Sequence, residues 1–229
     1  MYIRPGMLWW AIPAFLMLFL LGLALGFASG QENMEEWSAA EEKRQDETLL
    51  LSGLLDQLTE RGERSFMVTI EECVLKGTYN QGQFHLTGDV GGHKVEMKRD
   101  EQERVTVWID GKVQDHTALP YALYTPHEHA QLLKRVLDSA ITIPLQPESD
   151  QGWRGFRLSV PSGEVTELLD MWLGPSFSVR EIAQQAANQI AVDYQLWYDE
   201  QSGRVRQLDL ELQFRTPFGE KRDTLKFRM

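Results

Sequence analysis

Runs in which apolar and polar residues alternate, separated by short turn signals, constrain this chain more than any other feature. Alternation with a period of two places every second side chain on the same face of a β-strand. Such runs in the first half of the chain cover residues 65–74, 84–90, 93–98 and 105–109. Gly91-Gly92 and Asp110-Gly111 follow two of them and are typical of tight hairpin turns. We therefore predict four or five short strands in an antiparallel meander.

The same alternation returns near the end of the chain. Its apolar positions are Val192, Tyr194, Leu196, Tyr198, Val205, Leu208, Leu210, Leu212, Phe214, Leu225 and Phe227. Turn signals at residues 201–203 and 216–219 divide these positions among three strands. Because polar residues fill the alternate positions, each strand is expected to have one wet face and one dry face.

Helical signals lie between the two blocks of strands. Thr125-Pro126-His127-Glu128 combines an N-cap, a proline at the first helical position and a glutamate that completes a capping box. The apolar stripe behind it consists of Leu132, Leu133, Val136, Leu137 and Ala140. Further helices are expected at residues 164–173 and from residue 178 onward. The predicted fold class is α+β, with one antiparallel sheet whose dry face is covered by inserted helices.

An uncharged apolar run from Leu8 to Phe27 predicts a transmembrane helix. Its twenty residues, at ~1.5 Å each, match a bilayer core of ~30 Å. Arg4 precedes the run and acidic residues follow it, so the N-terminus is expected in the cytoplasm and the bulk of the chain outside. We predict a single-pass cell-membrane protein. Its parts are a cytoplasmic tip and transmembrane signal-anchor (1–30), an acidic stalk (31–48) and an extracytoplasmic α+β domain (49–229) that opens with an amphipathic helix.

Two alternatives to an uncleaved anchor stay open. Ala28-Ser29-Gly30 is a tolerable signal-peptide cleavage site, and cleavage there would give a secreted protein. The apolar run is longer than that of most signal peptides, which favours the anchor. A lipoprotein is less favoured, because no cysteine directly follows the run.

Composition and motifs exclude several classes of function. Acidic residues number 34 against 23 basic ones, a formal net charge of −11, so nucleic acid is not expected as a partner. The single cysteine, Cys73, excludes internal disulfides and clusters of zinc thiolates. No H-E-x-x-H, G-x-S-x-G, Walker A or G-x-G-x-x-G motif occurs. We expect no enzyme, no cofactor and no metal site.

The five histidines do not form a recognisable ligand pattern. His127 and His129 are two residues apart, which on a helix directs them to different sides and prevents chelation of one ion. We interpret the histidines as scattered surface residues.

Three short motifs carry a family resemblance. One is the hairpin Val107–Val113 around Asp110-Gly111-Lys112, and another is the strand Trp153–Pro161 followed by the predicted helix Glu164–Leu173. The third is the hairpin within Val192–Gln213, where residues 198–205 read YDEQSGRV. With the element order over residues 49–229, they resemble the LolA / LppX–LprG-like extracytoplasmic proteins. The closer similarity is to uncharacterised membrane-attached relatives in Gram-positive bacteria.

The resemblance implies a strongly curved sheet, an incomplete barrel covered by helices, whose hydrophobic interior holds acyl chains or lipoprotein lipid. It implies no catalytic residues. This chain departs from many members of the family because it has a predicted fixed anchor in place of a lipobox cysteine. A fixed anchor suits local lipid handling, sensing or support of a membrane partner better than long-range transport.

Two functions follow as hypotheses. The first is a membrane-tethered, non-enzymatic extracytoplasmic domain that binds a hydrophobic ligand, a lipid or acyl chain. The candidate lining residues are Trp108, Leu133, Val136, Leu137, Trp153, Leu169 and Trp172. The alternative is a protein-interaction or regulatory module with a filled core that supports a membrane or cell-envelope partner.

Overall fold

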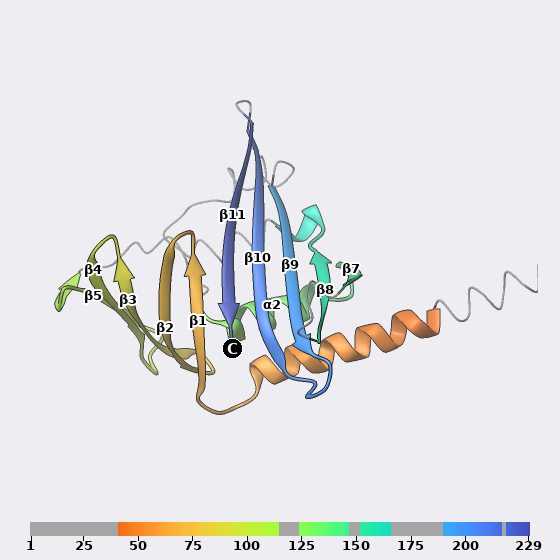
Figure 1. Cartoon of the computed structure of the whole chain (residues 1–229), viewed down its shortest axis with the longest axis horizontal. Coiled ribbons are helices and arrows are strands. Elements are labelled where there is room, and N and C mark those ends of the chain that lie inside the picture. Colours follow the sequence, from red (N-terminus) through yellow and green to blue (C-terminus); the bar gives the residue numbers. More distant parts are fainter. Residues whose placement is uncertain (1–40, 115–123, 147–151, 166–189, 217–218) are drawn as a thin grey trace, which may run out of the picture. The chain divides into compact units, whose positions relative to one another are not determined.

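The structure is a computed structural model that describes residues 41–114, 124–146, 152–165, 190–216 and 219–229 (Figure 1). The chain divides into two compact units, Met1–Leu50 and Leu51–Met229. Of the first unit, residues 41–50 are described; they are helical and mostly exposed. The predicted transmembrane run at residues 8–27 and most of the predicted stalk lie outside the described residues. Within the described ranges, none of the helices combines the length and apolar character that a membrane span requires.

The described part of the second unit forms one antiparallel sheet of eleven strands. The strands are β1 (Arg64–Ile70), β2 (Cys73–Asn80), β3 (Gln83–Val90), β4 (His93–Arg99), β5 (Val105–Ile109), β6 (Lys112–Gln114), β7 (Ile141–Leu145), β8 (Trp153–Ser159), β9 (Ile190–Asp199), β10 (Val205–Thr216) and β11 (Gly219–Arg228). Their order is β6-β5-β4-β3-β2-β1-β11-β10-β9-β8-β7, so β1 and β11 join the two meanders. The predicted α+β class with an antiparallel sheet is confirmed at this level.

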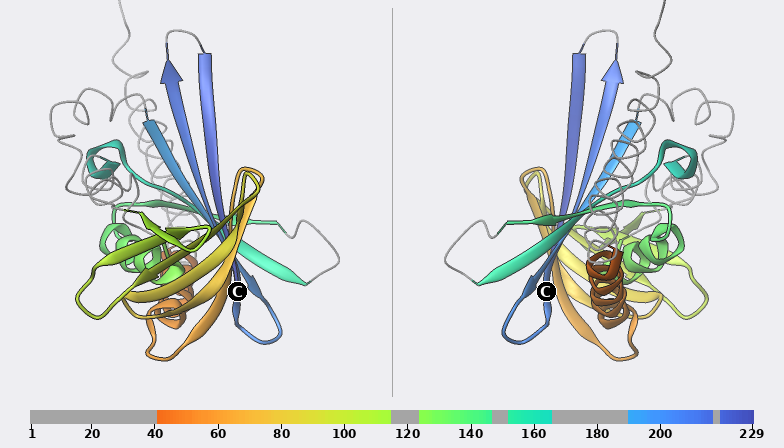
Figure 2. Two further views of the ribbon diagram at one scale, coloured as in Figure 1. Left: turned by 90° about the vertical axis from the view of Figure 1, so that its left-hand side faces the viewer. Right: turned by 90° about the vertical axis from the view of Figure 1, so that its right-hand side faces the viewer.

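Two described helical segments, residues 51–59 and α2 (Pro126–Val136), lie along the same side of the sheet (Figure 2). α2 falls between β6 and β7, as predicted for the first inserted helix. The sheet face toward these helices, here called the inner face, carries the buried apolar side chains; the opposite face is called the outer face. Residues 162–165 are helical, whereas the rest of that predicted helix and the helix predicted from residue 178 lie outside the described residues.

Two predicted hairpin turns are confirmed by their backbone angles. Gly91 and Gly92 have φ values of 60° and 84°, and Asp110 and Gly111 have φ values of 51° and 75°. Positive φ at both central positions is the geometry that a tight hairpin between twisted strands requires.

The prediction of one continuous run at residues 65–74 is wrong. The chain turns at Glu71-Glu72, and β2 begins at Cys73. Glu71 adopts a φ of 53°, although glutamate carries none of the glycine, asparagine or aspartate signals that usually mark such a turn. The sequence therefore lacks a local signal that separates β2 from β1.

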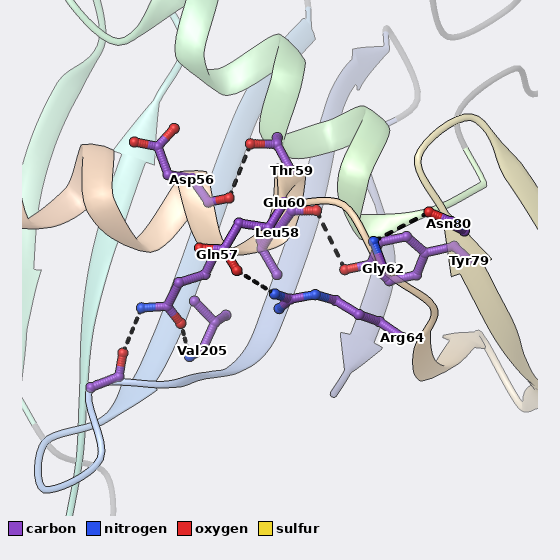
Figure 3. Close-up of polar contacts among 11 residues, drawn as sticks. Asp56, Gln57, Leu58, Thr59, Glu60, Gly62, Arg64, Tyr79, Asn80 and Val205 are labelled. Carbon is purple, nitrogen blue, oxygen red and sulfur yellow. Dashed lines mark hydrogen bonds and ion pairs between the residues drawn. The ribbon is translucent and has the colours of Figure 1, made fainter.

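The C-terminal end of the first helical segment is fastened to the sheet at two places (Figure 3). The Gln57 amide donates to the Gly203 carbonyl at 2.7 Å and accepts from the Val205 backbone N–H at 3.3 Å. The Tyr79 hydroxyl donates to the Leu58 carbonyl at 3.4 Å. These bonds provide partners for backbone groups at the end of the helical segment and at the start of β10. They attach the segment to both β2 and β10.

Candidate functional site

The inner face is the first candidate site, because its apolar side chains extend across almost the whole sheet. Fully buried members include Leu86 on β3, Leu158 on β8, Leu196 on β9 and Leu208 on β10. From the helices, Leu51, Leu54, Leu55, Leu58 and Leu133 are each at most 1% exposed. These side chains between the helices and the sheet are therefore shielded from solvent.

Apolar side chains of the inner face are less completely covered in two places. Near one edge, Val95, Val105 and Ile109 of β4 and β5 are half-buried and pack against the core. Ile190 and Phe214, paired near one end of β9 and β10, are also half-buried and pack against the core. The apolar area of the sheet thus continues beyond the closely packed centre.

α2 is attached to the inner face by polar as well as apolar contacts. Nδ1 of His129 lies 3.0 Å from the Tyr194 hydroxyl on β9, and burial raises the pKa of Tyr194. Burial lowers the pKa of His127, partly offset by a hydrogen bond to the Leu58 carbonyl. His127 and His129 are 5% and 0% exposed, so their interpretation as surface histidines is wrong. Residues on several sides of the first turn of α2 are buried, so both histidines lie in the interior although they point in different directions.

The start of α2 is held by the predicted capping box and by an ion pair from β4. Thr125 Oγ1 accepts from the Glu128 backbone N–H at 3.3 Å, while the Glu128 carboxylate accepts from the Thr125 N–H at 3.0 Å. The same carboxylate pairs with the Arg99 guanidinium, which lies 5.0 Å and 5.5 Å from the ring centres of Phe84 and Tyr124. Burial raises the pKa of Tyr124 to about 12.

The predicted lining residues lie on both sides of the sheet. Leu133 and Val136 are buried in the inner-face core, and Leu137 is half-buried against it. Trp108 and Trp153 alternate with the buried Val107 and Phe156 and therefore lie on the outer face. The structure thus does not bring Trp108 and Trp153 together with the leucines and valine of α2. Leu169 and Trp172 lie outside the described residues.

The outer face contains a groove of about 460 Å³ that the sequence did not predict. This outer groove is lined by Trp153, Gln195, Trp197, Gln207, Asp209, Glu211, Arg222, Thr224, Lys226 and Arg228. Its volume falls in the range of small-molecule sites. Of these ten residues, Trp153 is also one of the ligand contacts that the sequence predicts.

A glycine shapes one end of the outer groove. Gly155 pairs with Trp197 across β8 and β9, and a Cβ atom at Gly155 would lie 2.7 Å from Cε3 of the indole. The missing side chain lets the Trp197 ring lie against the strand, leaving the residue 7% exposed. The indole therefore forms a fixed wall rather than a free surface side chain.

The charged residues of the outer groove fall into two groups. Glu211 pairs with Arg222 at 2.7 Å, and Asp209, 9% exposed, accepts from the Gln207 amide at 2.8 Å. Lys226 and Arg228 are exposed and form no ion pair within the described part of the chain. Arg228 Nε donates to Gln207 Oε1 at 3.2 Å. Asp209 lies opposite Lys226 in the strand register, so the lining has three positive and two negative side chains and a surplus of one positive charge.

The described ranges contain no group of three or more histidine, cysteine, aspartate or glutamate residues placed to hold a metal ion. Cys73 is a free, half-buried thiol on β2.

No family model and no curated protein matches the sequence. Among solved structures, the chain is similar to the crystal structure of the Mycobacterium tuberculosis lipoprotein LppX, with a TM-score of 0.47 and 8% sequence identity. The similarity covers 79% of this chain and 91% of LppX. A similarity at this level assigns no property of LppX to this chain.

Proposed function

We propose that this protein is a membrane-tethered extracytoplasmic domain that binds a hydrophobic ligand, a lipid or acyl chain, without catalysis. One observation carries the proposal. The inner face is apolar across the sheet, and its half-buried side chains at β4–β5 and at β9–β10 offer apolar area that protein covers only in part. Covering such area with an acyl chain is favourable by ~25 cal/mol for each Å² removed from water.

The proposed contacts follow from that position. Val105 and Ile109 on β5, and Ile190 and Phe214 on β9 and β10, would contact the ligand directly. Leu137 is half-buried and adjoins the core, so it stays a predicted contact, as do Leu169 and Trp172. The proposed tether is supported by the uncharged run Leu8–Phe27, and the proposed outside location by Arg4 before that run.

The closely packed centre of the core favours a second candidate. A protein-interaction or regulatory module with a filled core needs no ligand, and Leu54, Leu133 and Leu208 are at most 1% exposed. In this case the half-buried apolar residues would support packing alone, and the partner would be a membrane or cell-envelope protein.

Native mass spectrometry of the full chain, extracted in detergent, separates the two candidates. The ligand proposal expects a co-purifying lipid, or saturable uptake of an added fatty acid. Val105→Asn and Phe214→Asn should lower occupancy at least fivefold. Thr106→Asn and Gln213→Asn, matched controls on the outer side of the same strands, should leave it unchanged. Absence of any bound lipid at saturating fatty acid would rule out the proposal and favour the filled-core module.

A further inference from the structure

The outer groove is lined mainly by polar and charged residues, which a site for a lipid would not need. Its apolar lining consists of Trp153 and Trp197 at one end, and the remaining lining residues are amides, a hydroxyl and charged groups. An acyl chain would find little apolar surface there. We therefore expect the groove to bind a ligand other than the one proposed for the inner face.

The strands beneath the outer groove limit how a ligand can be recognised. β9, β10 and β11 are each paired on both sides within the sheet. Their backbone N–H and C=O groups are already used in ladders, so a peptide cannot add as a further strand at this place. Recognition has to come from side chains.

Those side chains suit a molecule with many hydroxyl groups. Gln195, Gln207 and Thr224 lie on neighbouring strands of the same face and offer both donors and acceptors. The half-buried Trp153 borders them with an indole, a flat apolar surface of the kind on which the C–H face of a sugar ring can lie.

The charge of the outer groove adds a requirement for negative groups on the ligand. Arg222 is neutralised by Glu211, and Asp209 lies opposite Lys226, so the five charged lining residues leave one positive charge in surplus. Lys76, exposed on β2, extends this positive area, because Met67 lies between it and Arg228 in the strand register. A local positive surplus on a chain of net charge −11 provides charge complementarity for an anion. Nucleic acid is disfavoured by that same overall charge.

We propose that the outer groove binds an acidic saccharide through Lys226 and Arg228, with Trp153 against a sugar ring and the glutamines bonded to its hydroxyls. The site is separate from the inner face and does not depend on the hydrophobic ligand. Val105→Asn should therefore leave it intact.

Calorimetric titration of the full chain in a sugar-free detergent tests this proposal. Trigalacturonate should bind saturably and at least tenfold more tightly than neutral maltotriose or acidic triglutamate. Lys226→Gln and Arg228→Gln should each weaken its binding about tenfold. Lys112→Gln, a matched control at an exposed position of β6, should leave the affinity unchanged.

Three outcomes would overturn the acidic-saccharide site. They are no saturable binding of trigalacturonate, equal weakening by Lys112→Gln, and triglutamate binding as tight as trigalacturonate. The last would instead favour an acidic peptide partner. Circular dichroism of each variant shows whether the sheet is intact, and Lys226 and Arg228 are exposed, so their replacement does not disturb the core.

Discussion

The Tyr194 hydroxyl on β9 lies 3.0 Å from Nδ1 of His129 on α2, and the two side chains are 2% and 0% exposed. This contact joins the inserted helix to β9 in an interior that is otherwise mainly apolar. A polar pair in such a place fixes the position of the helix more narrowly than apolar packing alone, because hydrogen bonds are directional.

Tyr194→Phe should lower the free energy of unfolding by about 1–2 kcal/mol, since it removes this buried hydrogen bond and keeps the ring. Urea unfolding followed by circular dichroism measures the effect. Tyr198→Phe is the control. Tyr198 is buried and stacks on Phe156, but within the described residues its hydroxyl makes no side-chain hydrogen bond like that of Tyr194 to His129. Equal effects of the two substitutions would contradict a specific role for the His129 contact.

His127 should make the protein less stable in mild acid. Burial lowers its pKa below 6.5, so under pH 6.5 the unfolded chain accepts a proton that the folded state resists. The free energy of unfolding should therefore fall as the pH drops from 6.5 through the lowered pKa. In His127→Gln this part of the pH dependence should disappear, as measured by urea unfolding between pH 7 and about pH 5.

His93 provides a control of opposite sign. Its hydrogen bond with Asp110 raises its pKa above 6.5, so its contribution is present below pH 6.5 and is lost as the pH rises through the raised pKa. His93→Gln should make the protein more sensitive to acid, not less. A flatter pH profile in His93→Gln, or an unchanged one in His127→Gln, would refute the assignment.

The ion pair between Arg99 and Glu128 should be important for stability because both side chains are largely buried, at 12% and 11% exposure. Arg99→Ala leaves a buried carboxylate at the start of α2 and should cost about 3 kcal/mol in unfolding free energy. Arg104→Ala removes an exposed pair with Asp100, where Arg104 is 72% exposed, and should cost less than about 1 kcal/mol. Similar losses of unfolding free energy in the two variants would show that burial does not determine how much the Arg99–Glu128 pair stabilises the protein.

Gly155→Ala should displace the Trp197 indole, because the added Cβ would lie 2.7 Å from its ring. We expect a loss of about 1–3 kcal/mol and weaker binding of trigalacturonate in the outer groove. Gly82→Ala, where nothing lies within 4 Å of the added Cβ, should change stability by less than about 0.5 kcal/mol. Unaltered saccharide binding in a folded Gly155→Ala variant would argue against Trp197 as a wall of the site.

Much of the fold could be predicted because its local signals are strong. Asp110-Gly111 and the capping box at Thr125 and Glu128 each specify a backbone geometry through a few neighbouring residues. The turn at Glu71 could not be predicted in the same way. Its positive φ arises from the pairing of β1 with β2 over seven registered residue pairs, which outweighs the poor turn propensity of glutamate.

The face of the sheet on which a candidate residue lies follows from the alternation of side chains along its strand. The sequence shows this alternation for some of the strands. Val105, Val107 and Ile109 mark the inner face of β5, so Trp108 had to point to the other side. His129 likewise belongs to the helical stripe of Leu132, Leu133 and Val136, which indicates burial. The outer groove could not be predicted, because it joins side chains from β8 to β11 whose register appears only in the folded sheet.

Photo-crosslinking of the detergent-extracted full chain with a diazirine-bearing fatty acid, followed by peptide mapping, shows directly whether the inner face binds an acyl chain. We expect saturable crosslinks on the inner face, at Val105, Ile109, Ile190 or Phe214, and unlabelled fatty acid should displace them. Crosslinks confined to the outer face or to the run Leu8–Phe27, or crosslinks that unlabelled fatty acid does not displace, would contradict it.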